Sequence, residues 1–290
     1  MMWPPDPPDL PDLPDLPDPP GLTVMTFNIR YDDGSDGPLA WRPRRDRVIA
    51  AIRAQRPDLL AIQEPTDAQA RDIADAMPGW TPFGPSGEEW DDLDPPRGFV
   101  RADRFDIRDS GVFWLSDTPQ VARSVSFAND YGARACAWVA LHDRINGGDL
   151  VFGSTHFDTN QDGSLPSAIV LRTELDAIAG TAAVIVAGDF NSPAGSAAHR
   201  FLTGESGYRD AWTDAGLADR GVVTFNHFVV PHVAPAVDDA YGNLRIDWIL
   251  MRGPLACLSA AVDDAIAGPL PPSDHYPVIA RIRASAHSIS

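Results

Sequence analysis

Two short strings at the ends of hydrophobic runs contain the residue types needed for metal-assisted hydrolysis. The first is Gly188–Asn191, with the sequence GDFN, and the second is Ser273–His275, with the sequence SDH. Carboxylates are hard oxygen ligands that suit Mg²⁺, and histidine exchanges protons near neutral pH. A site that combines them is suited to hydrolysing a phosphoester with a divalent metal ion.

Four further polar residues stand where predicted strands end: Asn28, Glu64, His156 and Asp247. A side chain at a strand end is held by a rigid sheet and still reaches the rim, where catalytic groups commonly lie. We therefore expect one site that is assembled from several strand ends. The sequence contains no GxGxxG, Walker or GxSxG motif, so dinucleotide, P-loop and serine-hydrolase chemistry have no support.

The charge balance of the chain limits the partners it can bind. The 290 residues include 41 Asp and Glu and 23 basic residues, all of them Arg, which gives a net charge of −18. A general nucleic-acid scaffold normally has a basic face, so this balance argues against one. It does not exclude a nuclease, because a bound metal ion and a local arginine cluster can invert the field at a site.

Composition also bounds the compartment. No apolar run is long enough to span a membrane, and the N-terminus lacks the apolar segment of a secretory signal. Cys136 and Cys257 are the two cysteines, too few for a disulfide framework, so we expect buried free thiols in a reducing compartment. A cytoplasmic protein is the expectation that follows.

The chain divides into a tail, one domain and a short second tail. Residues 1–20 repeat Pro, Asp and Leu and should form an extended, disordered tail. A single domain is expected over residues 21–285, with a tail over residues 286–290. Strands are predicted at 22–27, 59–62, 105–107, 112–115, 135–141, 150–155, 183–187, 245–251 and 278–282, and helices at 44–55, 67–77 and 167–179. This order favours two sheets packed face to face and flanked by helices.

Six segments in this order resemble a known superfamily: Phe27–Arg30, Gln63–Glu64, Thr155–Asp158, Gly188–Asn191, Arg245–Trp248 and Ser273–His275. Each is weak alone, but together they are similar to the endonuclease/exonuclease/phosphatase superfamily with the deoxyribonuclease-I-like fold. The resemblance spans about residues 22–283 and is closest to a small bacterial branch. It implies an α/β (α+β) fold, a four-layer α/β/β/α sandwich of two mostly antiparallel sheets flanked by helices.

The same resemblance implies a metal site formed by Glu64, Asp274 and Asn28. Glu64 is a carboxylate at a strand end and suits Mg²⁺, which keeps several waters and needs few protein ligands. Mn²⁺ is the alternative ion. Asn28 would contact either the metal shell or a phosphate oxygen, and its neutral amide adds no negative charge.

Catalytic roles follow for the histidines and their neighbours. His275 is the candidate general base, and Asp247 would orient it and stabilise its charge. Asp189 would orient the attacking water or complete the metal shell, and Asn191 would donate to the phosphate. His156 would protonate the leaving oxygen or stabilise the pentacovalent phosphate.

Several positions leave alternatives open. Arg134 is either a phosphate clamp or a member of a structural ion pair. Asn226 lies in a segment that resembles a substrate-side loop, where relatives often carry histidine. Asp94 takes the place of a Glu that partners the second histidine in nuclease-like members, or is only a loop acid. Arg44 is either a packing partner of Trp41 or a substrate contact.

The leading functional hypothesis is a Mg²⁺-dependent phosphoester hydrolase that acts, as a monomer, on a small phosphorylated metabolite or a lipid headgroup. The alternative is a DNA or RNA nuclease of the same superfamily. The loop at residues 84–94 is rich in acids and would repel a polyanion, which disfavours nucleic acid. Only arginines between residues 42 and 47 and between residues 97 and 104 offset it. A binding module without catalysis is a third hypothesis.

Overall fold

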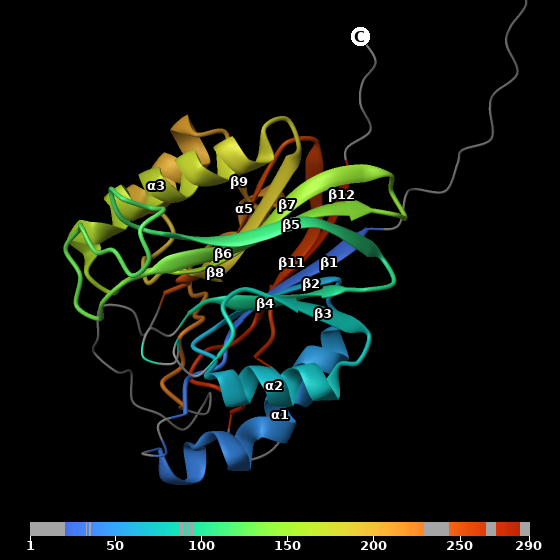
Figure 1. Cartoon of the computed structure of the whole chain (residues 1–290), viewed down its shortest axis with the longest axis vertical. Helices are drawn as coiled ribbons and strands as arrows, with labels where there is room; N and C mark the ends of the chain where they lie inside the picture. The colour runs from blue at the N-terminus through green and yellow to red at the C-terminus, as the bar shows by residue number, and fades with distance from the viewer. Residues whose placement is uncertain are drawn as a thin grey trace, which may run out of the picture.

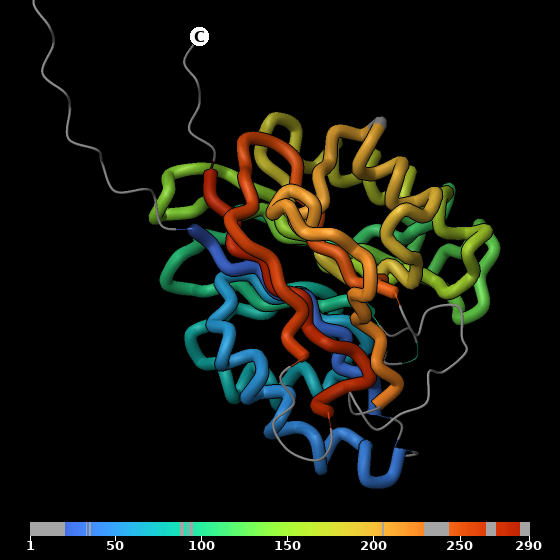
Figure 2. Tube along the Cα trace, turned by 180° about the vertical axis from the view of Figure 1, so that it is seen from behind, coloured from blue at the N-terminus to red at the C-terminus, as the bar shows by residue number. Residues whose placement is uncertain are grey.

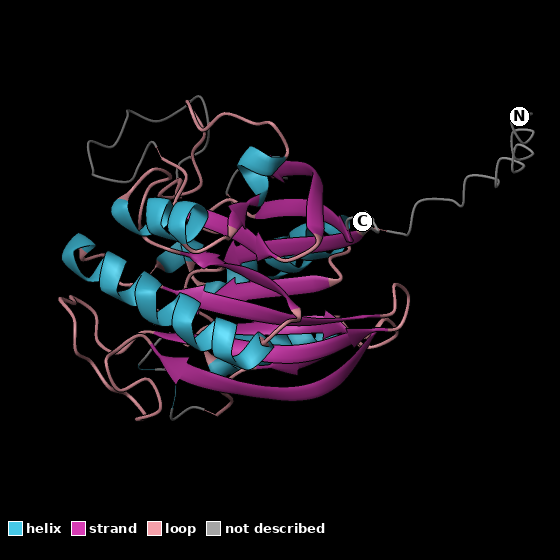
Figure 3. Ribbon diagram, turned by 90° about the horizontal axis from the view of Figure 1, so that it is seen from above, coloured by secondary structure: helices cyan, strands magenta, loops and turns pink. Residues whose placement is uncertain are grey.

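The chain folds as two six-stranded sheets packed face to face, with helices on the two outer faces (Figure 1, Figure 3). The computed structural model describes residues 21–32, 34, 36–87, 90, 92, 95–228, 244–264 and 271–284. The predicted four-layer sandwich is confirmed. The predicted tails at residues 1–20 and 286–290 lie outside the described residues.

The first sheet pairs the beginning and the end of the domain. Its strand order is β11 (Leu255–Val262), β12 (Val278–Ala284), β1 (Leu22–Asn28), β2 (Leu59–Gln63), β4 (Arg97–Arg101) and β3 (Trp80–Phe83). Only β1 and β2 are parallel, and α1 (Trp41–Gln55) makes the crossover between them. From behind, blue β1 lies beside a red strand, β12 (Figure 2).

The second sheet repeats this scheme. Its strand order is β5 (Phe105–Trp114), β6 (Ala135–Asp143), β7 (Gly148–His156), β8 (Ala183–Asp189), β10 (Asp247–Arg252) and β9 (Arg209–Asp210). Here β7 and β8 are the parallel pair, and α3 (Gln161–Ala179) joins them. The remaining helical segments are η1 (Gly37–Leu39), α2 (Asp67–Ala76), α4 (Ala197–Arg200), η3 (Phe201–Glu205) and α5 (Ala211–Asp214).

Three apolar layers separate the four structural layers. Successive residues of a strand face opposite sides of its sheet, so Val24 packs between the sheets while Met25 packs beneath α1 and α2. On the far side, Leu171 and Leu175 of α3 cover Val186 on the outer face of the second sheet. Since both faces of each central strand are buried, these strands read as continuous apolar runs in the sequence.

Most predicted elements are present, and the differences have local causes. The two short strands predicted at 105–107 and 112–115 are parts of one strand, because β5 runs unbroken with a register shift between Ile107 and Asp109. The helix predicted from residue 167 begins at Gln161, where the Asn160 side chain caps it, and continues through Pro166. Strands β3, β4, β9 and β11 were not predicted.

Both cysteines are free and buried, as predicted. Among the described helices, none is long and apolar enough to cross a membrane.

Candidate active site

The pairing register of the second sheet places three predicted site residues side by side. His156, the last residue of β7, pairs with Asp189 at the end of β8, and Asp189 pairs with Asp247 at the start of β10. Adjacent strands lie about 4.8 Å apart, so neighbours in register bring their side chains together. Positions separated by more than 30 residues in the sequence thus form one row.

Asn28 connects this row to the first sheet. It ends β1, and its side-chain amide donates to Glu64 Oε1 at 2.9 Å and to Asp189 Oδ2 at 3.1 Å. Glu64 follows β2, the parallel neighbour of β1. One buried amide therefore joins a carboxylate of each sheet.

Asp189 Oδ2 is the point where the site converges. It lies 3.5 Å from His156 Nε2 and 3.6 Å from His275 Nε2. The other ring nitrogen of His275, Nδ1, lies 2.9 Å from Asp247 Oδ2, as predicted for a carboxylate that orients a histidine. All four side chains are almost fully buried.

Burial and neighbouring charges shift the pKa values of this group in opposite directions. Burial, followed by the charge of Asp247, raises the pKa of Asp189 to about 7. Burial alone would lower the pKa of His275, but the carboxylates of Asp247 and Asp189 outweigh it and raise that pKa to about 10. These charges favour the protonated ring in this arrangement, whereas the sequence predicts that His275 acts as the general base.

His156 has different surroundings. Arg134 Nη1 lies 3.2 Å from its Nδ1, and Asn191 Nδ2 lies 3.1 Å from its Nε2. Burial, then the Arg134 guanidinium and His275, hold the pKa of His156 well below its usual range. A neutral ring can donate one hydrogen bond to a phosphate oxygen, but it is a poor source of a proton for a leaving group.

Arg134 lies beside a catalytic candidate and also belongs to an ion pair, so both roles predicted for it, phosphate clamp and ion-pair member, stay open. Besides the ring of His156, its Nε lies 3.6 Å from Asp158 Oδ2. The residue is 7% exposed. Asp158 was not predicted as a site residue, although its position two residues after the candidate His156 indicated a role near that histidine.

The carboxylates present suit a divalent cation. Burial raises the pKa of Asp274, and the charge of Glu64 raises it further. The carboxylates of these two residues therefore repel each other. A second set, Asp189, Asp247 and His275, offers ligand atoms within 4.8 Å of one another. Asp247 Oδ1 in that set is buried and has no hydrogen-bond partner among the described residues. A cation between Glu64 and Asp274 would relieve their repulsion, and one at the second set would satisfy Asp247 Oδ1.

Several site residues hold a backbone conformation that is uncommon outside glycine. Arg30, Glu64 and Asn191 have φ of 56°, 60° and 45°. For Glu64 the following Pro65 restricts the chain further. Such conformations cost free energy and persist where packing imposes them, as it commonly does at functional sites.

Arg44 organises the loops beneath the metal-side carboxylates. This fully buried guanidinium on α1 donates to the carbonyls of Ile29 and Arg30, to Leu39 O at 2.8 Å and to Pro272 O at 3.3 Å. Its ring contact with Trp41 is present as well, at 5.3 Å. Arg44 is thus a packing partner of Trp41 that also fixes the segments bearing Asn28 and Asp274.

Two neighbours complete this support. Ser273 Oγ donates to Asn28 O at 2.7 Å and so ties the two loops directly. Asn226 hydrogen-bonds to the backbone of the segment that carries Asp274. Its N–H donates to Asp274 O at 2.6 Å, and its Nδ2 donates to Ser273 O at 3.2 Å. Its Oδ1 is buried without a hydrogen-bond partner among the described residues, so it remains available as an acceptor.

One other prediction falls outside this group of contacts. Asp94, and with it the proposed pairing to His156, lies outside the described residues.

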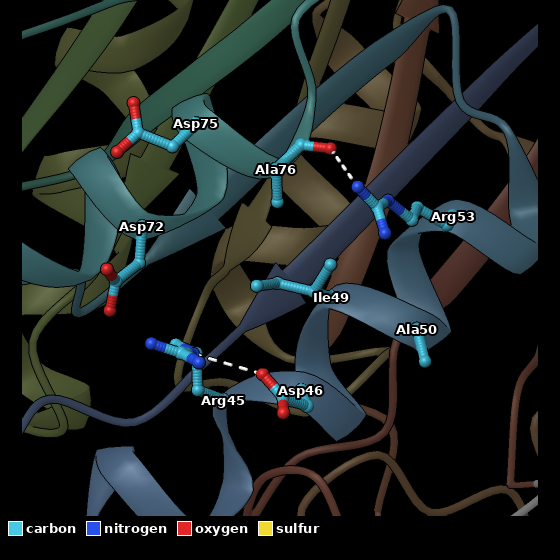
Figure 4. A pocket seen from close by; sticks show the side chains of 8 residues that line it. All are labelled: Arg45, Asp46, Ile49, Ala50, Arg53, Asp72, Asp75 and Ala76. Atoms are coloured by element: carbon cyan, nitrogen blue, oxygen red, sulfur yellow. Dashed lines mark hydrogen bonds and ion pairs between the residues drawn. The ribbon is translucent and has the colours of Figure 1, made fainter.

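A groove between α1 and α2 is lined by Arg45, Asp46, Arg53, Asp72 and Asp75, with Ile49, Ala50 and Ala76 (Figure 4). Arg45 pairs with Asp46, and Arg53 donates to Ala76 O. The groove contains none of the predicted site residues.

The chain is similar to known proteins in sequence and in fold. A family model described as "Endonuclease/Exonuclease/phosphatase family" matches residues 25–275. A comparison with curated proteins found no match.

Solved structures give the same fold. An endonuclease/exonuclease/phosphatase from Bacteroides vulgatus is 26% identical, with a TM-score of 0.79 over 91% of this chain and 99% of that one. The mannosyl-6-phosphatase Bt3783 of Bacteroides thetaiotaomicron is 23% identical, with a TM-score of 0.77 over 90% and 99%. The human Nocturnin catalytic domain is 19% identical, with a TM-score of 0.68 over 92% and 95%. The last two likenesses concern the fold.

Proposed function

Because the chain belongs to the Endonuclease/Exonuclease/phosphatase family, we propose that it is a divalent-metal-dependent phosphoester hydrolase acting on a small phosphorylated metabolite or a lipid headgroup. The observation that carries the proposal is the convergence on Asp189 Oδ2. That oxygen accepts from Asn28 and lies within 3.6 Å of both histidines. A carboxylate placed between two histidines and a possible metal shell is suited to positioning a water for attack on phosphorus.

The chain's own residues divide the work of such a reaction. Asp189 orients the attacking water and receives its proton. His275, fixed by Asp247, donates to the phosphoryl group, and His156 and Asn191 offer donors on the other side of Asp189. Mg²⁺ or Mn²⁺ held by Glu64 and Asp274, with Asn28 nearby, would supply Lewis-acid stabilisation of the phosphoryl oxygens.

The disposition of the arginines supports a small substrate over a nucleic acid. Arg44, Arg97 and Arg104 are buried, and Arg101 pairs with Asp58 and Asp103. These residues belong to the two clusters that would have to offset the acidic loop at residues 84–94. Side chains that are buried or paired contribute little to phosphate contacts along a polyanion.

A metal-supplemented screen tests the proposal. Purified protein with Mg²⁺ should hydrolyse phosphomonoesters or small phosphodiesters faster than oligonucleotides, and EDTA should abolish the activity. Asp189→Ala and His275→Ala should each lower kcat by about 10³-fold or more while retaining the wild-type circular dichroism spectrum. His142→Ala is the matched control, because His142 also pairs with an aspartate, Asp149, but lies outside the site.

The outcomes separate the alternatives. Faster cleavage of oligonucleotides would favour the nuclease instead. Full activity in either site variant, or in EDTA, would overturn the assignment of the site.

A further inference from the structure

The most exposed large apolar side chain of the described residues lies at the catalytic end of the second sheet. Tyr131 is 66% exposed, ahead of Val121 at 56%. It belongs to the connection between β5 and β6, which leaves the sheet at Trp114 and returns at Ala135. Ala135 pairs in register with His156, so this connection borders the row of site residues.

A buried carboxylate fixes the backbone that presents Tyr131. Asp158 Oδ2 accepts the N–H of Tyr131 at 3.0 Å, and Asp158 Oδ1 accepts the N–H of Asp130 at 2.8 Å. Asp158 is 6% exposed and also accepts the N–H of Asn160 at 2.9 Å, at the start of α3. An exposed aromatic ring on an anchored backbone loses little further entropy when it binds a ligand.

Arg134 links this ring to the chemistry. Its guanidinium carbon lies 5.8 Å from the centre of the Tyr131 ring, and its Nη1 lies 3.2 Å from His156 Nδ1. The ring therefore stands one side chain away from a histidine that faces Asp189. A phosphoester bound at Asp189 with its organic part on the His156 side would extend toward Tyr131.

We propose that Tyr131 is a stacking contact that selects phosphoesters whose organic part is a ring, over open-chain phosphoesters. An aromatic face binds flat bases by stacking and binds sugar rings through their apolar C–H faces. Sugar phosphates and nucleotides share this chemistry, and the experiment distinguishes them. The inference rests on the proposed function, because it assumes that a phosphoester occupies the site.

The test compares three substrates of the wild-type protein with Mg²⁺: a hexose 6-phosphate, a nucleoside monophosphate and glycerol phosphate. Tyr131→Ala should raise KM about tenfold for the preferred ring substrate, with kcat within about twofold, and should leave glycerol phosphate unchanged. Tyr131→Phe keeps the ring and should behave as wild type. Ile145→Ala is the control, since Ile145 is 50% exposed beyond the opposite end of β6.

Each outcome is decisive. If the wild-type protein prefers the hexose phosphate or the nucleotide, and Tyr131→Ala abolishes that preference, the preferred substrate identifies the ring that Tyr131 binds. An equal KM change for glycerol phosphate, or unchanged kinetics in Tyr131→Ala, would refute the stacking role while the proposed hydrolysis stands. If the wild-type protein hydrolyses none of the three yet acts on another phosphoester of the metal-supplemented screen, the inference fails and the proposed function stands. Inactivity throughout that screen would overturn the proposed function itself. Should Tyr131→Ala fail to fold, Tyr131→Leu supplies an apolar side chain without a ring and gives the same comparison.

Discussion

At the scale of single residues, the site depends on a buried arginine that holds its loops together. Arg44 is buried and donates to carbonyls of two loops that are more than 200 residues apart in the sequence. Burial lowers its pKa to about 10, and the carboxylates of Asp274 and Asp32 only partly offset that shift. A guanidinium suits this task because its donors spread in a plane, whereas an ammonium group acts as a point charge.

Arg44→Met should destabilise the protein by about 3 kcal/mol and weaken Mg²⁺ binding, because the loops bearing Asn28 and Asp274 lose their shared donor. Thermal unfolding and calorimetric Mg²⁺ titration measure the two effects. Arg45→Met provides the control, since Arg45 lies next to it on α1 and its side chain is 43% exposed. Equal Mg²⁺ affinity of Arg44→Met and wild type would show that the loops hold their positions without the guanidinium.

At the scale of elements, the approach of β7 to β8 decides whether His156 meets Asp189. Gly188 makes this approach feasible: a Cβ there would collide with the carbonyl oxygen of Thr155 on β7. The glycine of the GDFN string is therefore a packing requirement of the sheet, one residue before the catalytic candidate.

Gly188→Ala should cost about 3 kcal/mol of folding free energy and most of the activity, because the backbone of β7 must move away. Gly148→Ala, at the other end of β7, meets no atom within 4 Å and should change stability by less than about 0.5 kcal/mol. Urea unfolding of both variants makes the comparison. A Gly188→Ala protein as stable as wild type would mean that the strands tolerate a wider spacing.

The sequence was sufficient to predict the central strands, the three long helices and a site at the strand ends, and insufficient to predict what lies around that site. Short apolar runs that end at Asn28, Glu64 and Asp189 are typical of buried strands. The positions of these three residues at strand ends could therefore be predicted. The partners of His156 did not follow, because Arg134 reaches it only through the pairing of β6 with β7. The role of Asp158 depends on a loop with no periodic pattern, and Tyr131 carries no motif at all.

At the scale of the whole molecule, a buried ion cluster ties the two sheets together at the end away from the site. Arg104 pairs with Asp58, which precedes β2 of the first sheet, at 3.1 Å and with Asp143, which ends β6 of the second sheet, at 2.7 Å. Although burial opposes it, hydrogen bonding and the charge of Arg104 lower the pKa of Asp143.

Because the folded pKa of Asp143 lies below its unfolded value of about 3.9, its ionised form stabilises the fold fully above that pH. The contribution is lost as pH falls through the folded pKa. Asp143→Asn should therefore cost about 3 kcal/mol at neutral pH, and its difference from wild type should shrink below about pH 4. Urea unfolding across pH measures this, with Asp149→Asn, 68% exposed, as the control. A difference in stability that stays constant down to pH 2 would show that it does not depend on the ionisation of Asp143.

The pairing of β1 with β12 also has a consequence for biosynthesis. A ribosome makes β1 early, yet its antiparallel partner, with Leu22 opposite Ile282, follows some 260 residues later. Contacts between distant parts of a chain close slowly and leave an open strand edge in the meantime. Asp274 and His275 lie just before that partner in the sequence, within the same late segment. The first sheet and the candidate site are therefore completed by the same late part of the chain.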